Sequence, residues 1–368
     1  MVYRAIGIMS GSSLDGLDIV FAEFQEQGGK WSYEINQSAC YPYNEDWISR
    51  LKNATSLPAK DYLLLHTAYG HYIGEQVNVF IEEKQLHFQA GLIASHGHTT
   101  FHLPAQKMTA QLGDGAAIAA KTGLPVVTDL RAVDVAFGGQ GAPIVPIGEK
   151  YLFSGYDYFL NIGGIANISV AGEPHSGGWA FDICPANRVL NMLANEAGKE
   201  YDEGGQMASS GKVNQQLLDK LNQLDYYKQN PPKSLANDFG TDTVYPIIQS
   251  YRLSTADALR TYCEHITFQT ARAISDLCNH KPQTINKKLL STGGGSHNQF
   301  LIHLLSEQLS TIGIDVTVPD AALINYKEAL IMAFIGVLRW RQEYNVLASV
   351  TGAERNSIGG ALWTGQEA

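Results

Sequence analysis

Residues 6–24 read IGIMSGSSLDGLDIVFAEF. Residues 6–9 and 19–24 are apolar enough for two buried strands, whereas residues 10–18 between them are mostly small, polar or acidic. The pattern predicts a strand–turn–strand unit. The turn has two interpretations: an ordinary polar β-turn closed by an aspartate side chain, or a loop that holds a ligand.

Similar units recur further along the chain. An apolar run at 158–162 is followed by Gly163-Gly164 and a second apolar run at 165–170. Residues 288–291 lead into Thr-Gly-Gly-Gly-Ser at 292–296, and a helix is expected from about residue 298 to 309. Each half of the chain therefore contains a strand–turn–strand unit followed by alternating helices and strands, which predicts two α/β domains.

Other segments support this class. Short apolar runs at 92–95 and 126–128 end in polar residues, as buried strands of an α/β sheet do. Residues 114–121 read as a short helix between them, and residues 256–278 and 326–344 read as long helices. In the last of these, apolar residues at helical spacing predict packing against a sheet.

The length also favours two domains. The chain has 368 residues, beyond the roughly 250–300 at which one hydrophobic core stops growing. The glycine-rich residues 138–141 precede Pro143 and mark a candidate crossing between domains. We predict a first domain over 1–137, a second over 138–344, and a C-terminal helix over 345–368 that joins the first domain.

Composition narrows the function. Lys and Arg number 26 against 36 Asp and Glu, a net charge of −10, which argues against a broad nucleic-acid surface. A nucleotide remains possible, because backbone N–H groups bind phosphate without side-chain charge. The four cysteines are scattered and indicate free thiols in a reducing compartment. No signal peptide is evident and the apolar stretch 329–338 is too short for a membrane span, so we expect a soluble cytoplasmic protein.

The glycine-rich turns are the first candidate sites. Residues 11–18 offer glycines and serines for phosphate oxygens, and Asp15 and Asp18 carry the oxygen ligands that Mg²⁺ prefers. This is not a Walker A loop, because no Lys-Ser/Thr pair follows the glycines. Three glycines at 293–295 are conformationally costly. Either a ligand passes over that turn or a strand and a helix pack tightly there, and the sequence favours neither.

Two further segments carry polar side chains. Three histidines, His96, His98 and His102, follow a predicted strand, and hydrogen bonding to a ligand or to nearby loops is favoured over a zinc site. Asp182 precedes a predicted helix and suits either a general base or a helix cap. Cys184 has no basic neighbour close in sequence and reads as a small buried residue.

Taken together, the motifs resemble the anhydro-N-acetylmuramic acid kinase family in order across nearly the whole chain. They are MSGSSLDGLD (9–18), SHGHTTFH (95–102), QLGDGA (111–116), TDLR (128–131), GGQGAP (138–143), NIGGIAN (161–167), FDICPAN (181–187), PPKS (231–234) and TGGGSHN (292–298). The resemblance implies two actin-like, ribonuclease H-like α/β domains with an ATP cleft between them, and a homodimer.

The implied reaction opens the 1,6-anhydro bond of the sugar and phosphorylates O6 with ATP and Mg²⁺ in peptidoglycan recycling. By resemblance Asp182 is the catalytic base, Asp15 and Asp18 serve the metal, and His96, Arg131 and Glu328 contact the sugar. The implied nucleotide-binding residues are Gly11, Ser12, Ser13, Leu14, Asp15, Gly16, Leu17, Asp18, Gly163, Gly164, Gly293, Gly294, Gly295 and Ser296.

The chain departs from the family pattern at several positions. Ile183, Cys184 and Ala186 replace a threonine and two glycines beside Asp182, and His98 stands where the family has glutamine. Residues 235–238 lack the usual Thr-Gly-Arg-Glu run. These departures leave open a kinase for a different amino or anhydro sugar. A nucleotide-binding homologue without turnover is the other alternative, because actin-like folds also include such proteins.

Overall fold

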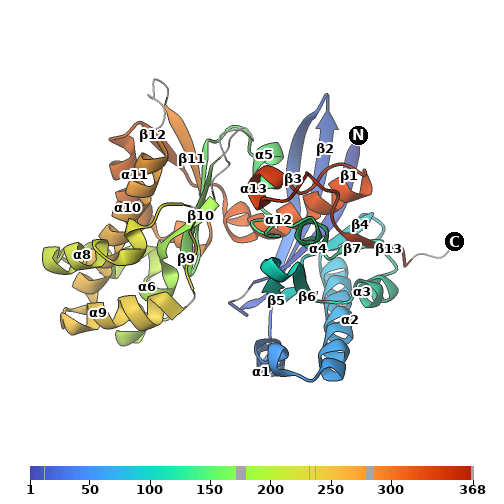
Figure 1. The fold of residues 1–368 in the computed structure, drawn as a ribbon, viewed down its shortest axis with the longest axis horizontal. Helices are drawn as coiled ribbons and strands as arrows, with labels where there is room; N and C mark the ends of the chain where they lie inside the picture. Colours follow the sequence, from blue (N-terminus) through green and yellow to red (C-terminus); the bar gives the residue numbers. More distant parts are fainter. Residues whose placement is uncertain (12, 171–179, 232, 237, 279–285, 366–368) are drawn as a thin grey trace. The chain divides into compact units, whose positions relative to one another are not determined.

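The computed structural model describes the chain except residues 12, 171–179, 232, 237, 279–285 and 366–368. The chain divides into two compact units. Unit 1 consists of Met1–Ser154 and Tyr326–Ala368, and unit 2 consists of Gly155–Asn325. Both are α/β, as the sequence predicts, and each is described by itself (Figure 1).

Unit 1 is built on a six-stranded sheet in the order β13-β7-β4-β1-β2-β3. The strands are β1 (Val2–Ser10), β2 (Gly16–Gln27), β3 (Lys30–Pro42), β4 (Leu92–Ser95), β7 (Val126–Thr128) and β13 (Ala361–Trp363). β1, β2 and β3 pair antiparallel, whereas β4 and β7 continue the sheet parallel to β1. A separate hairpin joins β5 (His98–Leu103) and β6 (Met108–Leu112).

The helices of unit 1 cover its sheet with apolar side chains. They are α1 (Glu45–Lys52), α2 (Ala59–Glu83), α3 (Gly115–Thr122), α4 (Ala132–Ala136), α5 (Pro146–Leu152), α12 (Ala321–Trp340, in this unit from Tyr326) and α13 (Ala348–Thr351). One core joins Ile6 and Ile8 of β1 to Tyr69, Ile73 and Val77 of α2. The Asp114 side chain caps α3 by accepting a hydrogen bond from Ala116 N at 2.9 Å.

Unit 2 repeats the arrangement with a five-stranded sheet in the order β10-β9-β8-β11-β12. The strands are β8 (Tyr158–Ile162), β9 (Ile165–Val170), β10 (Ala180–Pro185), β11 (Lys287–Thr292) and β12 (Ile314–Thr317). β8, β9 and β10 are antiparallel neighbours, and β11 and β12 run parallel to β8. The order and directions match β3-β2-β1-β4-β7 of unit 1, so the repeat expected from the sequence is confirmed.

The helices of unit 2 are α6 (Asn187–Glu196), α7 (Gln206–Ser210), α8 (Gln215–Asn222), α9 (Tyr245–Ser250), α10 (Thr255–Cys278) and α11 (Gln299–Ser310). α10 is the central one, since it contacts β10 and the helices α6, α7, α8 and α11. Its buried side chains Leu259, Tyr262, Ile266 and Ile274 join the core formed by β8, β9 and β10.

The domain boundaries differ from those expected. The units divide at residues 154/155 and 325/326, not at 137/138 and 344/345. α5 belongs to unit 1 because Glu149 forms a buried ion pair with Lys327 of α12, N to O 3.3 Å. The glycine-rich segment 138–141 is not a crossing: Asp134 accepts hydrogen bonds from Gly141 N and Thr351 Oγ1, at 2.7 and 2.6 Å, and holds the segment inside unit 1.

The C-terminal segment joins unit 1, but not as the expected helix over 345–368. As far as residue 365 it contains the short helix α13 and the strand β13, which pairs antiparallel with β7. The predicted helix over 326–344 is displaced: α12 ends at Trp340, and Tyr326 interrupts it with φ −122°.

α12 is, in the described part of the chain, the one helix that is long and apolar enough to cross a membrane. Its apolar window is 72% buried inside the protein. That burial is typical of a core helix in a soluble protein, and it agrees with the helix packing predicted from the sequence.

A close contact between β1 and α12 gives the first testable prediction. A Cβ atom on Gly7 would collide with the carbonyl oxygen of Ala329 and would lie 2.6 Å from Ala333 N. Because backbone atoms cannot move aside cheaply, Gly7→Ala is expected to destabilise unit 1 by about 1–3 kcal/mol. Thermal or denaturant unfolding measures this.

The matched control is Gly155→Ala, where an added Cβ meets nothing within 4 Å. This variant should stay within about 0.5 kcal/mol of the parent. Equal unfolding midpoints for the two variants would contradict the assigned packing.

Candidate active site

The opening stretch forms a β-hairpin in unit 1, as predicted. β1 and β2 pair from Val2↔Gln25 to Ser10↔Leu17. Leu14 N donates to Gly11 O at 3.4 Å, and Leu14 has a φ of 60°. A positive φ is unfavourable for leucine and such conformations cluster at functional sites. Ser12, one of the predicted phosphate contacts in this turn, lies outside the described residues.

Three carboxylates gather beside this turn. Burial raises the pKa of Asp18 to about 6, and the negative charges of Glu328 and Asp15 add to that effect. A hydrogen bond with the Cys40 side chain partly offsets it. The structure therefore brings the two predicted metal ligands, Asp15 and Asp18, near the predicted sugar contact Glu328, within unit 1.

These carboxylates could supply one or two ligands to Mg²⁺, but they do not form a complete metal site. Concentrated negative charge with a raised pKa is stabilised by a divalent cation, and Mg²⁺ commonly uses one or two protein carboxylates with phosphates and waters. Within the described ranges no group of three His, Cys, Asp or Glu side chains is arranged to enclose an ion. Asp18 is the better candidate because it is the more buried of the two aspartates.

Arg131 follows β7 and lies in the same unit. Its Nε donates to His96 Nε2 at 2.8 Å, and its Nη1 donates to the carbonyl oxygen of Gly141. Burial lowers the pKa of Arg131 to about 10, opposed by the charges of Glu328 and Asp134, so the guanidinium stays charged at neutral pH. Its Nη2 has no partner among the described residues and is available to an anionic ligand group.

His96 holds Arg131 in place. Burial and the charge of Arg131 lower the pKa of His96 to about 3, so the ring is neutral. Nε2 accepts from Arg131, and Nδ1 lies 2.9 Å from Gly97 O, which requires the proton on Nδ1. Both ring nitrogens are therefore engaged within the protein, and the predicted sugar contact of His96 would have to be indirect.

A second buried network ends on His98. Tyr69 Oη lies 2.5 Å from Tyr43 Oη, Tyr43 Oη donates to Ser10 Oγ at 2.8 Å, and Ser10 Oγ lies 3.1 Å from His98 Nδ1. The Ser10 hydroxyl therefore links Tyr43 to the ring of His98. The three histidines of this segment hence take separate hydrogen bonds, and the zinc hypothesis gains no support from the described residues.

Asp182 lies in β10 of unit 2. The pairing of β9 and β10 shifts register between Asp182 and Cys184, so Ile183 is the extra residue of a bulge. Leu235 N donates to Asp182 Oδ2 at 2.8 Å, and Asp182 N donates to Lys233 O at 3.1 Å. Burial raises the pKa of Asp182, partly offset by the Leu235 hydrogen bond. A raised pKa suits a general base.

Cys184 is fully buried, and burial raises the pKa of its thiol. A buried thiol of high pKa is a poor nucleophile. The structure agrees with the interpretation of Cys184 as a small core residue, and it packs in the core of unit 2.

The Gly163-Gly164 turn connects β8 to β9 and meets the start of α6. Ala186 N donates to Gly164 O at 2.8 Å, and Asn187 N donates to Gly163 O at 3.0 Å. The first amides of α6 are therefore occupied by the turn. A phosphate group at this turn would therefore need a hydrogen-bond donor other than the first amides of α6.

The three glycines at 293–295 are explained by two different features of the structure. Gly293 has a φ of 81° and a Cβ there would lie 2.5 Å from Asn161 Oδ1, while a Cβ on Gly295 would lie 2.8 Å from Ile162 Cβ. Gly294 is exposed, and a Cβ there would be 3.7 Å from its nearest neighbour, Asn187 Nδ2. Tight packing explains Gly293 and Gly295, whereas Gly294 leaves an open backbone face.

A cavity of about 650 Å³ lies beside that open face. It lies wholly within unit 2, and its lining includes Asn187, Asn191, Tyr201, Gly294, Gly295 and His297. Side-chain amides and an aromatic ring are suitable partners for a nucleoside. This cavity is the best candidate for the adenosine site next to Gly293–Ser296.

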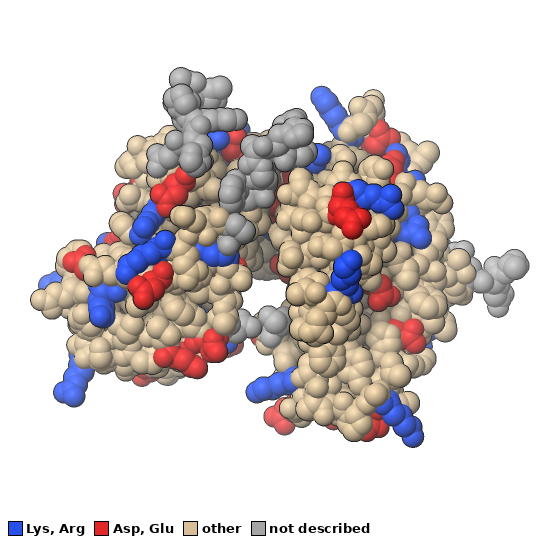
Figure 2. Space-filling model, in the orientation of Figure 1, with Lys and Arg blue, Asp and Glu red and all other residues tan. Residues whose placement is uncertain are grey.

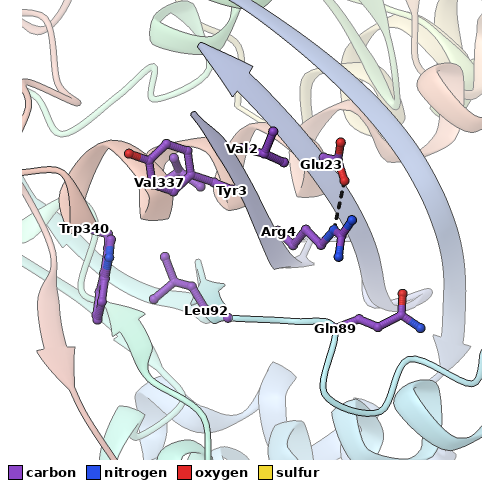
Figure 3. Close-up of a pocket in the computed structure, with 9 residues that line it drawn as sticks. Val2, Tyr3, Arg4, Glu23, Gln89, Leu92, Val337 and Trp340 are labelled. Carbon is purple, nitrogen blue, oxygen red and sulfur yellow. Dashed lines mark hydrogen bonds and ion pairs between the residues drawn. The ribbon is translucent and has the colours of Figure 1, made fainter.

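Two other cavities have none of the predicted site residues in their lining, although Phe181 and Ile183, on either side of Asp182, line one of them. One, of about 640 Å³, is lined by Tyr3, Arg4, Leu92 and Trp340, with Arg4 paired to Glu23 at 2.9 Å (Figure 3). It lies at the amino ends of β1 and β4, whereas ligands of open α/β sheets bind at the carboxyl ends of the strands. Another, of about 620 Å³, lies in unit 2 between β10 and the end of α10.

Charges are mixed over the face drawn in Figure 2, with acidic and basic side chains interspersed. This agrees with the net charge of −10.

The sequence did not reveal the partners of the predicted residues. Cys40, Tyr43 and Tyr69 come from β3, the loop after it and α2, and no spacing in the sequence links them to residues 10–18. His98 was part of a motif, but its connection to Tyr43 through Ser10 joins residues far apart in the sequence.

Comparison with known proteins identifies the family. The family model for anhydro-N-acetylmuramic acid kinase matches residues 3–365. Relatives of that name from Sulfurovum sp. and Synechococcus elongatus are 34% and 32% identical, each over 98% of this chain and 99% of their own. One from Vibrio vulnificus is 32% identical over 98% of both chains.

Solved structures are more distant. The activator of the 2-hydroxyisocaproyl-CoA dehydratase from Clostridium difficile, with bound ADPNP, has a TM-score of 0.43 at 12% identity and covers 92% of this chain and 96% of its own. A ROK family protein from Streptococcus pneumoniae in complex with sucrose has a TM-score of 0.37 at 9% identity, covering 92% of this chain and 99% of its own. Neither bears on the site.

The family model and the relatives both extend over nearly the whole chain. The chain belongs to the anhydro-N-acetylmuramic acid kinase family and is an enzyme of the kinase class.

Proposed function

We propose that the protein opens the 1,6-anhydro bond of anhydro-N-acetylmuramic acid and phosphorylates O6, giving N-acetylmuramic acid 6-phosphate and ADP in peptidoglycan recycling. The observation that carries the proposal is Asp182, a carboxylate of raised pKa held by one backbone N–H in a chain of this family. Its other oxygen, Oδ1, has no hydrogen-bond partner among the described residues and would be the atom that accepts a proton.

Opening of the ring and phosphoryl transfer would be coupled through O6. Asp182 Oδ1 accepts a proton from a water whose oxygen forms a bond to C1 of the sugar. The C1–O6 bond breaks and its electron pair stays on O6, which attacks the γ-phosphorus of ATP. The bond between that phosphorus and the bridging oxygen breaks, and ADP leaves. The proton taken by Asp182 then returns to solvent.

The phosphates of ATP need positioning and charge neutralisation more than covalent chemistry. In unit 1 the backbone of residues 11–15 and the carboxylate of Asp18 would serve the phosphates and Mg²⁺. Mg²⁺ supplies neutralisation of the phosphate charge. In unit 2 the open face of Gly294 and the adjacent cavity would take the adenosine.

The sugar carries a lactyl carboxylate, which a guanidinium binds well. Nη2 of Arg131 has no partner among the described residues, while His96 and Gly141 accept hydrogen bonds from Nε and Nη1. Arg131 would thus hold the carboxylate, His96 would orient Arg131, and Glu328 would accept a hydrogen bond from a sugar hydroxyl.

A different amino or anhydro sugar is the second candidate, because Ile183, Cys184 and residues 235–238 alter the loops around Asp182. Leu235 itself donates to Asp182, so that altered loop touches the base directly. An ADP-release screen of related sugars separates the two substrates. ATP binding without sugar-dependent ADP release would instead indicate a homologue without turnover. The cytoplasmic location and the homodimer stay expectations.

Asp182→Asn should lower turnover about 10²–10⁴-fold, because an amide cannot accept the proton. Since the active form is the deprotonated one and burial raises its pKa, the parent rate should fall as pH drops through a value above the usual carboxylate range. Sugar-dependent ADP release, measured as a function of pH, tests both the loss of turnover and the pH dependence.

The exposed Asp225→Asn is the control and should keep full activity. Undiminished activity in Asp182→Asn would refute the mechanism.

Asp18 predicts a pH-dependent magnesium requirement. Its pKa of about 6 means that protons compete with the cation as pH falls. The Mg²⁺ concentration that gives half-maximal activity should therefore increase as the pH is lowered from about 7.5 to about 5.5. Asp18→Asn should need at least about tenfold more Mg²⁺ and lose this dependence, whereas Glu23→Gln should behave as the parent. A Mg²⁺ requirement that is flat across this range in the parent would exclude Asp18 as the ligand.

Gly294→Val tests the adenosine site. The new side chain has space in the free protein but would project from the exposed face of the turn, so folding should be unchanged while the KM for ATP rises about tenfold or more. Gly155→Val, at another exposed glycine with open space, controls for the substitution itself. An unchanged KM for ATP would place the nucleotide elsewhere.

A further inference from the structure

Arg188 is a cation without a partner among the described residues, and it lies at a turn where phosphate is expected. It is the second residue of α6, and its Nε is buried without a hydrogen bond. Among the described residues no carboxylate pairs with it and no carbonyl accepts from its guanidinium. A buried donor left unpaired costs about 1–3 kcal/mol, and such groups mark functional positions.

The side chain lies against the Gly163-Gly164 turn. A Cβ built on Gly164 would have only Arg188 atoms near it, with Nε at 3.9 Å and Nη2 at 4.0 Å. The backbone joins the same two places, since Arg188 N donates to Gly164 O at 3.4 Å. Arg188 therefore runs over the turn that connects β8 to β9.

The positive charge of Arg188 would compensate for the lack of basic residues in the glycine-rich turns. None of the segments 11–18, 163–164 and 293–296 contains a lysine or an arginine. The first amides of α6 are already taken by the carbonyls of Gly163 and Gly164, so they cannot serve an anion. A phosphoryl oxygen at this turn would thus find its donor in the Arg188 guanidinium, which binds phosphate in a planar, bidentate geometry.

We propose that Arg188 binds the phosphate tail of the nucleotide at the Gly163-Gly164 turn. The proposal rests on the proposed function, because it requires ATP in this site. It assigns the electrostatic part of nucleotide binding in unit 2 to a residue that lies outside all of the glycine-rich turns.

The test compares ligands with and without phosphate. Calorimetric titration measures the affinity of Arg188→Met for ATP, ADP and adenosine. Loss of a charge-assisted contact should weaken ATP and ADP about 10- to 100-fold and leave adenosine unchanged. Lys199→Met, at an exposed position just beyond the other end of α6, should bind all three ligands as the parent does.

Steady-state kinetics and unfolding complete the test. Arg188→Met should raise the KM for ATP and not that for the sugar, and its thermal midpoint should not fall, since the unpaired Nε is removed. Arg188→Lys should recover part of the ATP affinity. Equal loss for adenosine and ATP, a raised KM for the sugar alone, or a lowered midpoint with unchanged ATP binding would each overturn the proposal. If the parent binds no ATP, the proposed function itself fails.

Discussion

The contact between Gly7 of β1 and the backbone of α12 is the constraint on which unit 1 depends. Since residue 7 has no side chain, Ala329 and Ala333 lie directly against the strand. This brings the segment after residue 325 back to the sheet formed by the first strands. The buried Glu149–Lys327 pair secures the same helix to α5. Glu328, the next residue, thereby comes close enough to Asp18 to raise the pKa of that carboxylate.

Burial is also what differentiates the polar groups of the site. Removing a group from water disfavours its charged form, which raises the pKa of Asp18 and Asp182 and keeps His96 neutral. A neutral His96 accepts a hydrogen bond from Arg131, which a charged ring would repel. The same physical effect thus raises the proton affinity of Asp182 and keeps His96 a neutral acceptor.

Several strands were predictable because they are short apolar runs with polar ends, whereas β3 is long and polar and has no such pattern. The strands at 92–95, 126–128, 158–162 and 165–170 begin and end as expected. The boundaries between the units were not predictable. A glycine-rich segment such as 138–141 has the same sequence pattern whether it crosses between domains or folds back within one. Asp134 decides the matter by binding Gly141 and Thr351. That contact joins residues far apart in the chain and leaves no local pattern.

The sequence by itself determined the α/β class, the repeated strand–turn–strand units and the family, because periodicity and motifs are local properties of the chain. Only the tertiary structure decided what each polar residue does. It divided the three glycines at 293–295 into two that packing requires and one with an open face. It also placed Arg188 over the Gly163-Gly164 turn and ended a buried hydrogen-bond chain on His98. Burial and hydrogen-bond partners come from residues distant in sequence, so the role of a side chain is fixed only once the chain has folded.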